Sequence, residues 1–164
     1  MATFLLITGV ILLSAGIVEA FRHPSAGAVA SYAGLVALLN SGYGSPLTQQ
    51  ALLFWAIAVI MVCGISMAGG DTRQKSHPVA NRYIAGGALV GMLAALTLGQ
   101  SAMIVGSAVG AVLGGVAWSR TPSGKSASVG LWRIVVSDGL PAVVTMTVIG
   151  MAVGMLLIKN RQPV

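Results

Sequence analysis

Long apolar runs with almost no charge recur along the whole chain, and they limit what it can fold into. The sequence has 164 residues, of which 56% are hydrophobic and 7% are charged, and its mean hydropathy is +0.91. A soluble domain carries about 25% charged residues, so this chain has too few to cover a water-facing surface. In a bilayer the backbone must satisfy its own hydrogen bonds, which leaves helices or closed barrels. The runs are continuous and do not alternate with period two, so they predict membrane-spanning helices.

Six spans follow from the positions of these runs, because about 20 apolar residues cross a bilayer. The first run lacks the basic n-region of a secretory signal and is followed by more spans, so it is interpreted as a retained helix. The second is short and rich in small residues, so it either inserts halfway or packs steeply. Together the runs predict an all-α, polytopic bundle that forms one integral membrane domain over residues 1–164. The predicted spans are Thr3–Phe21, Ala26–Asn40, Ala51–Met67, Tyr83–Gly99, Ser101–Trp118 and Asp138–Ile158.

The basic residues predict how this bundle is oriented. Seven of them fall on one side of a six-span model, and the positive-inside rule makes that side cytoplasmic, with the protein in the cell (inner) membrane. Lys159 and Arg161 follow the last span and lie on the opposite side. An alternative topology has a re-entrant sixth segment, broken at Asp138-Gly139-Leu140-Pro141, which places this tail in the cytoplasm. The basic residues are not interleaved with aromatic residues, so the sequence does not indicate nucleic-acid binding. The seven are Arg22, Arg73, Lys75, Arg82, Arg120, Lys125 and Arg133.

Small residues recur every four positions in two adjacent spans. Residues at i and i+4 lie on one face of a helix, so each span carries a strip without side chains. Such strips let two backbones approach closely in lipid, where no hydrophobic effect drives helices together. The connection is very short, which makes the two spans antiparallel neighbours in a close-packed hairpin. The predicted helix-packing residues are Gly87, Gly91, Ala95 and Gly99 in the fourth span, Ala102, Gly106, Gly110 and Gly114 in the fifth, and Gly150 and Gly154 as a third strip in the sixth.

The hairpin at Gly87–Gly115 follows a basic loop and three apolar segments, and one more apolar segment comes after it. This arrangement resembles domain-of-unknown-function family 456 of small glycine-rich bacterial membrane proteins. The turn "RHPSAGA" is similar to a Pro/Gly-rich turn of that family. The chain lacks the doubled Pro-Gly pattern there, and Gly115 and Val116 stand where the family leads us to expect an acidic residue. The resemblance covers roughly residues 5–157. It implies an architecture and no chemistry, because the family has no established activity.

Three polar residues are candidates for a functional role. Asp138 begins the sixth span, where it suits a helix N-cap or an acid in the first turn. An ionisable group within a membrane is also a functional hypothesis by default. Glu19 lies near the end of the first span and is explained by an i,i+3 pair with Arg22. Arg133 is the expected charge partner of Asp138 if the protein is a transporter with a gate at this position.

Other reactive side chains form no recognisable site. His23 and His77 each precede a proline, which marks them as turn residues, and neither has a metal ligand at suitable spacing. Cys63 is the single cysteine, so no disulfide forms within the chain. The eight methionines are interpreted as adaptable packing. No catalytic residue, metal site or cofactor is predicted, and the chain is not expected to be an enzyme. The tryptophans lie near span ends and fit an interfacial belt: Trp55, Trp118 and Trp132.

Two classes of function remain. The favoured one is a structural, accessory or oligomerising membrane protein, whose glycine hairpin serves self-association or docks a membrane-protein partner among the membrane lipids. The alternative is a small transporter or channel component for an apolar, lipid-like or small solute. The scarcity of polar residues argues against ion transport. Internal duplication would favour a transporter, but the two halves of the sequence show no convincing repeat.

Overall fold

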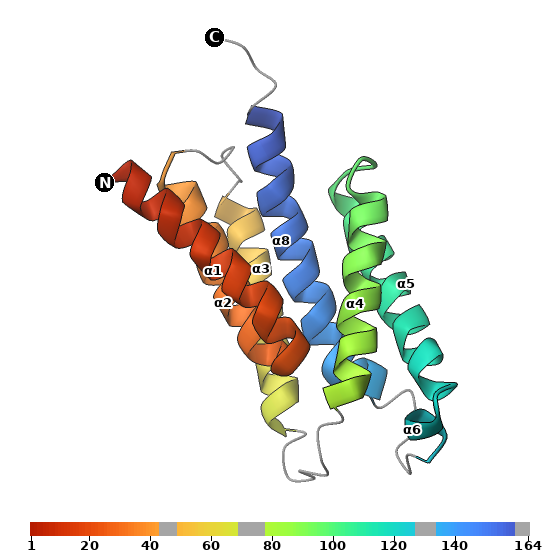
Figure 1. The fold of residues 1–164 in the computed structure, drawn as a ribbon. Coiled ribbons are helices and arrows are strands. Elements are labelled where there is room, and N and C mark those ends of the chain that lie inside the picture. Colours follow the sequence, from red (N-terminus) through yellow and green to blue (C-terminus); the bar gives the residue numbers. More distant parts are fainter. Residues whose placement is uncertain (43–48, 69–77, 127–133, 160–164) are drawn as a thin grey trace.

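The computed structural model describes residues 1–42, 49–68, 78–126 and 134–159. In these ranges the chain is helical and contains no strand, so the predicted all-α class is confirmed. Figure 1 shows the helices side by side as a bundle. They are α1 (Ala2–Arg22), α2 (Pro24–Asn40), α3 (Gln49–Ala68), α4 (Pro78–Ala95), α5 (Gln100–Ser119), the short α6 (Pro122–Lys125), the π-helical turn η2 (Val135–Gly139) and α8 (Leu140–Lys159).

Four stretches of helix within the described ranges are long and apolar enough to cross a membrane. A shorter apolar helix covers Leu52–Ser66, and α2 has 17 residues, fewer than the roughly 20 that span a bilayer. These lengths and compositions are those of a membrane protein. The four long stretches are Ala2–Arg22, Val79–Leu98, Ser101–Ser119 and Val135–Leu157.

Two connections between helices are very short. His23 alone separates α1 from α2, with an extended φ of −136° and ψ of 88° that suits a residue before proline. Pro24 then begins α2, at a helical position where its missing N–H is not needed. Between α4 and α5 the chain turns at Gly99, whose φ of 103° is rarely adopted by residues with a side chain. Each short connection forces its two helices to be antiparallel neighbours.

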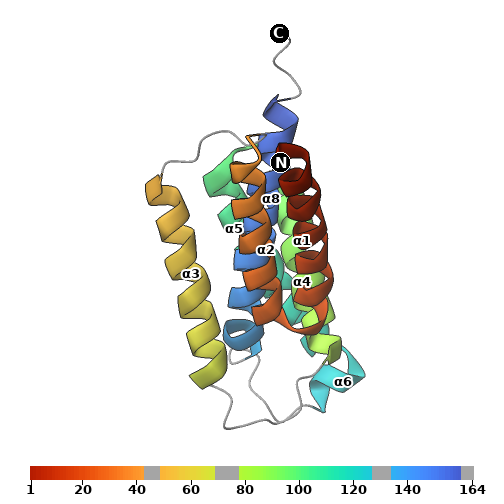
Figure 2. The same cartoon turned by 90° about the vertical axis from the view of Figure 1, so that its left-hand side faces the viewer.

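The bundle consists of two helical hairpins with α8 between them. Hairpins α1–α2 and α4–α5 lie on either side of α8 in Figure 1, and α8 contacts all four of their helices. Figure 2 shows α3 at the periphery, where it contacts α2 and α8. The helices alternate in direction along the chain, so α1 and α4 run in opposite directions. The most apolar part of α8 is 61% buried, against 22% for α1, which makes α8 the centre of the core.

The start of the sixth segment is continuous helix, which contradicts the predicted break at Asp138–Pro141. Residues Val135–Gly139 form a π-helical turn that leads directly into α8. Pro141 lacks an N–H and its ring would clash with a carbonyl one turn earlier in an α-helix. The wider π-turn just before it gives the ring space without ending the helix. The re-entrant alternative, which needs the chain to reverse here, therefore does not describe this structure.

The ends of α1, α5 and α6 and the start of α4 carry basic residues and gather at one end of the bundle, whereas α8 ends at Lys159 at the opposite end. Arg22 ends α1, Arg82 lies in the second turn of α4, Arg120 follows α5 and Lys125 ends α6. These helix ends lie together at the bottom of Figure 1, whereas the N-terminus and the end of α8 lie at the opposite end. The rest of the basic set lies outside the described residues: Arg73, Lys75 and Arg133.

Trp118 and Trp55 are buried in the bundle, where neighbouring helices cover their side chains, and the interfacial belt stays a prediction. The side chain of Trp118 is 1% exposed, although it lies two residues from the end of α5. Trp55 is also buried, and Trp132 lies outside the described residues. The belt prediction uses only the distance of a residue from the end of its span. Burial depends on the direction in which the side chain leaves the helix, and that is set by the neighbouring helices.

Candidate functional site

The backbones of α4 and α5 approach closely along their small residues. A Cβ atom added at Gly91 would overlap the carbonyl oxygen of Gly106, and one added at Gly87 would overlap that of Gly110. The reverse substitutions meet the same obstacle, since a Cβ at Gly110 would overlap the carbonyl oxygen of Gly87. Further along, a Cβ at Gly114 would overlap the carbonyl oxygen of Tyr83. No residue larger than glycine fits at these positions unless the backbones separate.

Two alanines lie beside this line of glycines. The Cβ of Ala95 on α4 would be 2.8 Å from a Cβ added at Gly106, so Ala95 already fills the space opposite that glycine. Ala102 on α5 is partly buried and packs against the core. We name the contact between α4 and α5 along Gly87, Gly91, Gly106, Gly110 and Gly114, with Ala95 beside it, the α4–α5 seam.

Three of the predicted helix-packing glycines lie outside this seam. Gly99 is the turn residue before α5, and a Cβ there would meet no described atom within 4 Å. Gly154 on α8 likewise has no described atom within 4 Å of its Cβ position. Gly150 on α8 is packed, but its neighbours are methionine side chains of α4 and α5. The predicted third glycine strip is therefore wrong, because the four-residue spacing gives a common face on α8 without saying what lies opposite it.

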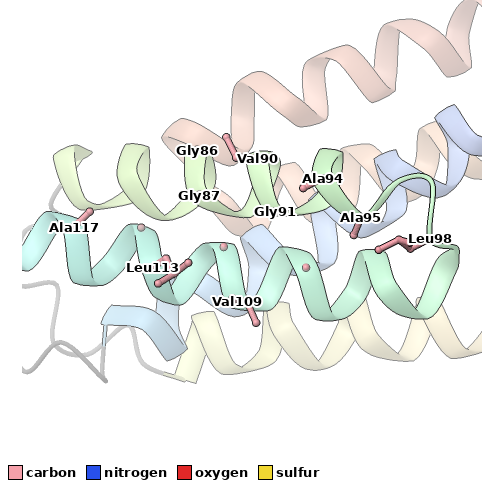
Figure 3. Close-up of a pocket in the computed structure, with 13 residues that line it drawn as sticks. Gly86, Gly87, Val90, Gly91, Ala94, Ala95, Leu98, Val109, Leu113 and Ala117 are labelled. Atoms are coloured by element: carbon pink, nitrogen blue, oxygen red, sulfur yellow. The ribbon is translucent and has the colours of Figure 1, made fainter.

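An apolar groove follows the seam on the outside of the hairpin. Its volume is about 570 Å³, and each of its thirteen lining residues is a glycine or an aliphatic residue. Figure 3 shows Val90, Leu98, Val109 and Leu113 among its labelled residues. The side chains of Val90 and Leu113 are 65% and 62% exposed, so they form free edges of the groove. The side chains of this groove offer no hydrogen bond to a polar ligand.

A second set of close contacts joins α1 to α2, and sequence reasoning missed it. A Cβ added at Gly27 would lie 2.8 Å from the backbone N of Ala20, and one at Gly34 would lie 2.9 Å from the backbone N of Leu13. Cβ positions at Gly9 and Gly16 are 3.1 and 3.0 Å from backbone atoms of α2. The signal was present as a seven-residue spacing, at 9 and 16 and again at 27 and 34. A search for four-residue repeats does not detect it.

Two of the three candidate polar residues, Asp138 and Glu19, lie within the described part of the chain. Asp138 lies inside the π-helical turn with helical residues before it, so the N-cap prediction is wrong and the first-turn alternative describes its position. Its side chain is half-buried. Glu19 is half-buried in the last turn of α1. Arg133 lies outside the described residues, so its pairing with Asp138 stays a prediction.

Searches of protein-family models, curated proteins and solved structures find no match to this chain. The resemblance to family 456 therefore remains a prediction that rests on the hairpin at Gly87–Gly115.

Proposed function

We propose that this chain is a small integral membrane protein with a structural or oligomerising role, and that glycine repeats hold its helices together. The proposal extends to six spans in one membrane domain. The observation that carries it is the α4–α5 seam, where backbone meets backbone at successive turns. Lipid supplies no hydrophobic drive between helices, so association depends on close packing and weak Cα–H contacts. Small residues make both possible.

The outer groove is the proposed docking surface for a second copy of the chain. Small-residue surfaces are typical of helix–helix interfaces in membranes. The glycines of the seam form part of the groove lining, and exposed aliphatic side chains stand along its length. A helix from another copy could therefore seat its side chains between Val90 and Leu113 without meeting a polar group.

Gly86→Leu tests this surface without disturbing the seam. Gly86 lines the groove, and a Cβ there meets no described atom within 4 Å, so leucine fills the groove and leaves the hairpin intact. We expect the purified wild-type protein to be an oligomer by size-exclusion chromatography with light scattering, and Gly86→Leu to be largely monomeric. The matched control is Gly64→Leu on α3, which also has open space at its Cβ and lies away from the groove. A monomeric wild type, or an oligomer that Gly86→Leu does not weaken, would contradict the docking proposal.

The distribution of basic residues supports an orientation with the α1–α2 turn and α6 in the cytoplasm. In a Cys63→Ser background, we expect Ser123→Cys to be protected from an impermeant thiol reagent in intact cells and Ser101→Cys to be labelled. Both serines are exposed, and they lie at opposite ends of the bundle, in α6 and at the start of α5. Labelling both variants after permeabilisation is the control. The reverse pattern in intact cells would overturn the orientation.

A transporter is the second candidate, and the order of the helices favours it. Helices α1, α2 and α3, and likewise α4, α5 and α8, consist of a short-turn hairpin followed by a further long helix, and the two units run in opposite directions. Inverted repeats of this kind are typical of secondary transporters. Proteoliposomes that take up glycerol or urea faster than empty vesicles, with uptake lost in a well-folded Asp138→Asn variant, would support this candidate. Under the structural role we expect no uptake above that of empty vesicles.

A further inference from the structure

Two methionine sulfur atoms converge inside the bundle where α4, α5 and α8 meet. The Sδ atoms of Met92 and Met103 each lie 2.9 Å from the Cβ position of Gly150. The two sulfur atoms are therefore separated by at most twice that distance. Both methionine side chains are buried, and they come from different helices of the hairpin. Because Gly150 has no side chain, the space in front of α8 is left to these two thioethers.

Other uncharged atoms that can ligate a metal ion lie along the same helices, near these two methionines in the sequence. One turn from Met103 on α5, the hydroxyl of Ser107 lies 3.1 Å from that of Thr147 on α8, and both residues are fully buried. Met146 and Met151 bury two more thioether side chains on α8, on either side of Gly150 in the sequence. This section of the bundle interior thus combines sulfur and hydroxyl oxygen atoms without any charged side chain among the residues named.

The chemistry of these donors selects one class of ligand. Thioether sulfur is a soft donor, and soft donors prefer Cu⁺ among the biological metal ions. An isolated charge within a bilayer is costly, so bonds to sulfur must offset the loss of hydration. Na⁺ and K⁺ are hard ions that gain little from sulfur and would stay in water. A single soft monovalent ion is small enough to bridge two flexible thioethers that already face the same point.

We propose that Met92 and Met103 form a binding site for a soft monovalent metal ion, Cu⁺ or its analogue Ag⁺, in front of Gly150. The site goes beyond the proposed oligomerising role and does not depend on it, because all the named atoms belong to one copy of the chain. Packing alone requires apolar volume at these positions, which leucine supplies equally well. The observation on which the proposal rests is that two buried sulfur atoms from different helices converge on the Cβ position of one glycine.

The first test titrates Ag⁺ into the purified full-length Cys63→Ser protein in detergent, in a nitrate buffer with excess K⁺. Removing Cys63 is necessary because its thiol would bind the same ion. We expect about one bound Ag⁺ per chain, with an affinity that falls roughly tenfold or more in Met92→Leu and in Met103→Leu. Methionine and leucine are similar in volume, so the melting temperature should change little. The control is Met61→Leu, whose side chain is 61% exposed on α3 and which should bind like the parent.

A second pair of variants leaves every thioether in place. Gly150→Ala adds a Cβ at the point where both sulfur atoms converge, whereas Gly154→Ala meets no described atom within 4 Å. We expect Gly150→Ala to weaken Ag⁺ binding and Gly154→Ala to leave it unchanged. The proposal is overturned if Cys63→Ser binds no Ag⁺, if Met61→Leu loses as much affinity as Met92→Leu, or if Gly150→Ala binds like the parent. None of these outcomes depends on whether the protein oligomerises.

Discussion

Gly91→Ala should lower the melting temperature of the detergent-solubilised protein by roughly 2–12 °C, the shift that corresponds to an overpacking cost of about 1–3 kcal/mol. The added methyl group would overlap the carbonyl oxygen of Gly106, so α4 and α5 must separate to admit it. The obstacle is backbone, which cannot rotate away as a side chain could. Separation at one level also weakens the contact at neighbouring levels, because the two helices are rigid over several turns.

Gly64→Ala on α3 is the matched control for this prediction. It adds the same methyl group within a helix, at a position outside the groove where no described atom lies within 4 Å. Alanine is the better helix former by about 1 kcal/mol in water, so this variant should melt at or slightly above the wild-type temperature. A thermal-unfolding series on the three proteins gives the comparison. Equal shifts for the two variants would show that the close approach at Gly91 does not limit stability.

Trp118→Ala should be the most damaging single truncation at the basic end of the bundle. Its side chain is 1% exposed and is among the largest fully buried side chains in the described residues. Truncating a buried tryptophan costs about 3–5 kcal/mol, which corresponds to a fall in melting temperature of roughly 6–20 °C. The cause is the loss of contacts together with a cavity that rigid helices cannot close.

Val105→Ala serves as the control on the same helix. Val105 is 61% exposed and faces away from the core, so its truncation removes surface that lipid or detergent can replace. We expect its melting temperature to stay close to that of the wild type. If Trp118→Ala melts at the same temperature as Val105→Ala, the buried position of Trp118 is wrong.

The sequence predicted the parts of the fold that local chemistry controls. Uninterrupted apolar runs predicted helices because a backbone in lipid must satisfy its own hydrogen bonds. His23 before Pro24 predicted a turn, because proline disfavours a helical conformation in the residue before it. The four-residue spacing of Gly87, Gly91, Gly106 and Gly110, with a short connection between the two helices, predicted which faces of α4 and α5 meet. In each case the cause lies within a few residues along the chain.

The sequence did not predict the contacts that depend on which helices become neighbours. The α1–α2 contacts use a seven-residue spacing, and Gly150 faces methionines of two other helices instead of a glycine. Asp138 lies within a π-helical turn because the wider turn admits Pro141. From the sequence alone, such a turn cannot be distinguished from a break in the helix. Trp118 is buried although its distance from the helix end suggested an interface.

By itself, then, the sequence determined that this chain is helical and apolar and where two of its tight turns fall, and it predicts that α4 and α5 pair through small residues. Only the tertiary structure decided that α8 lies between two hairpins, which methionines converge on Gly150, and which large side chains are buried. The physical reason is the solvent. In water, polarity separates the buried face of a helix from its exposed face. In lipid both faces are apolar, so a leucine or tryptophan in the sequence can be either buried or lipid-facing. Only the packing of the helices determines which of the two it is.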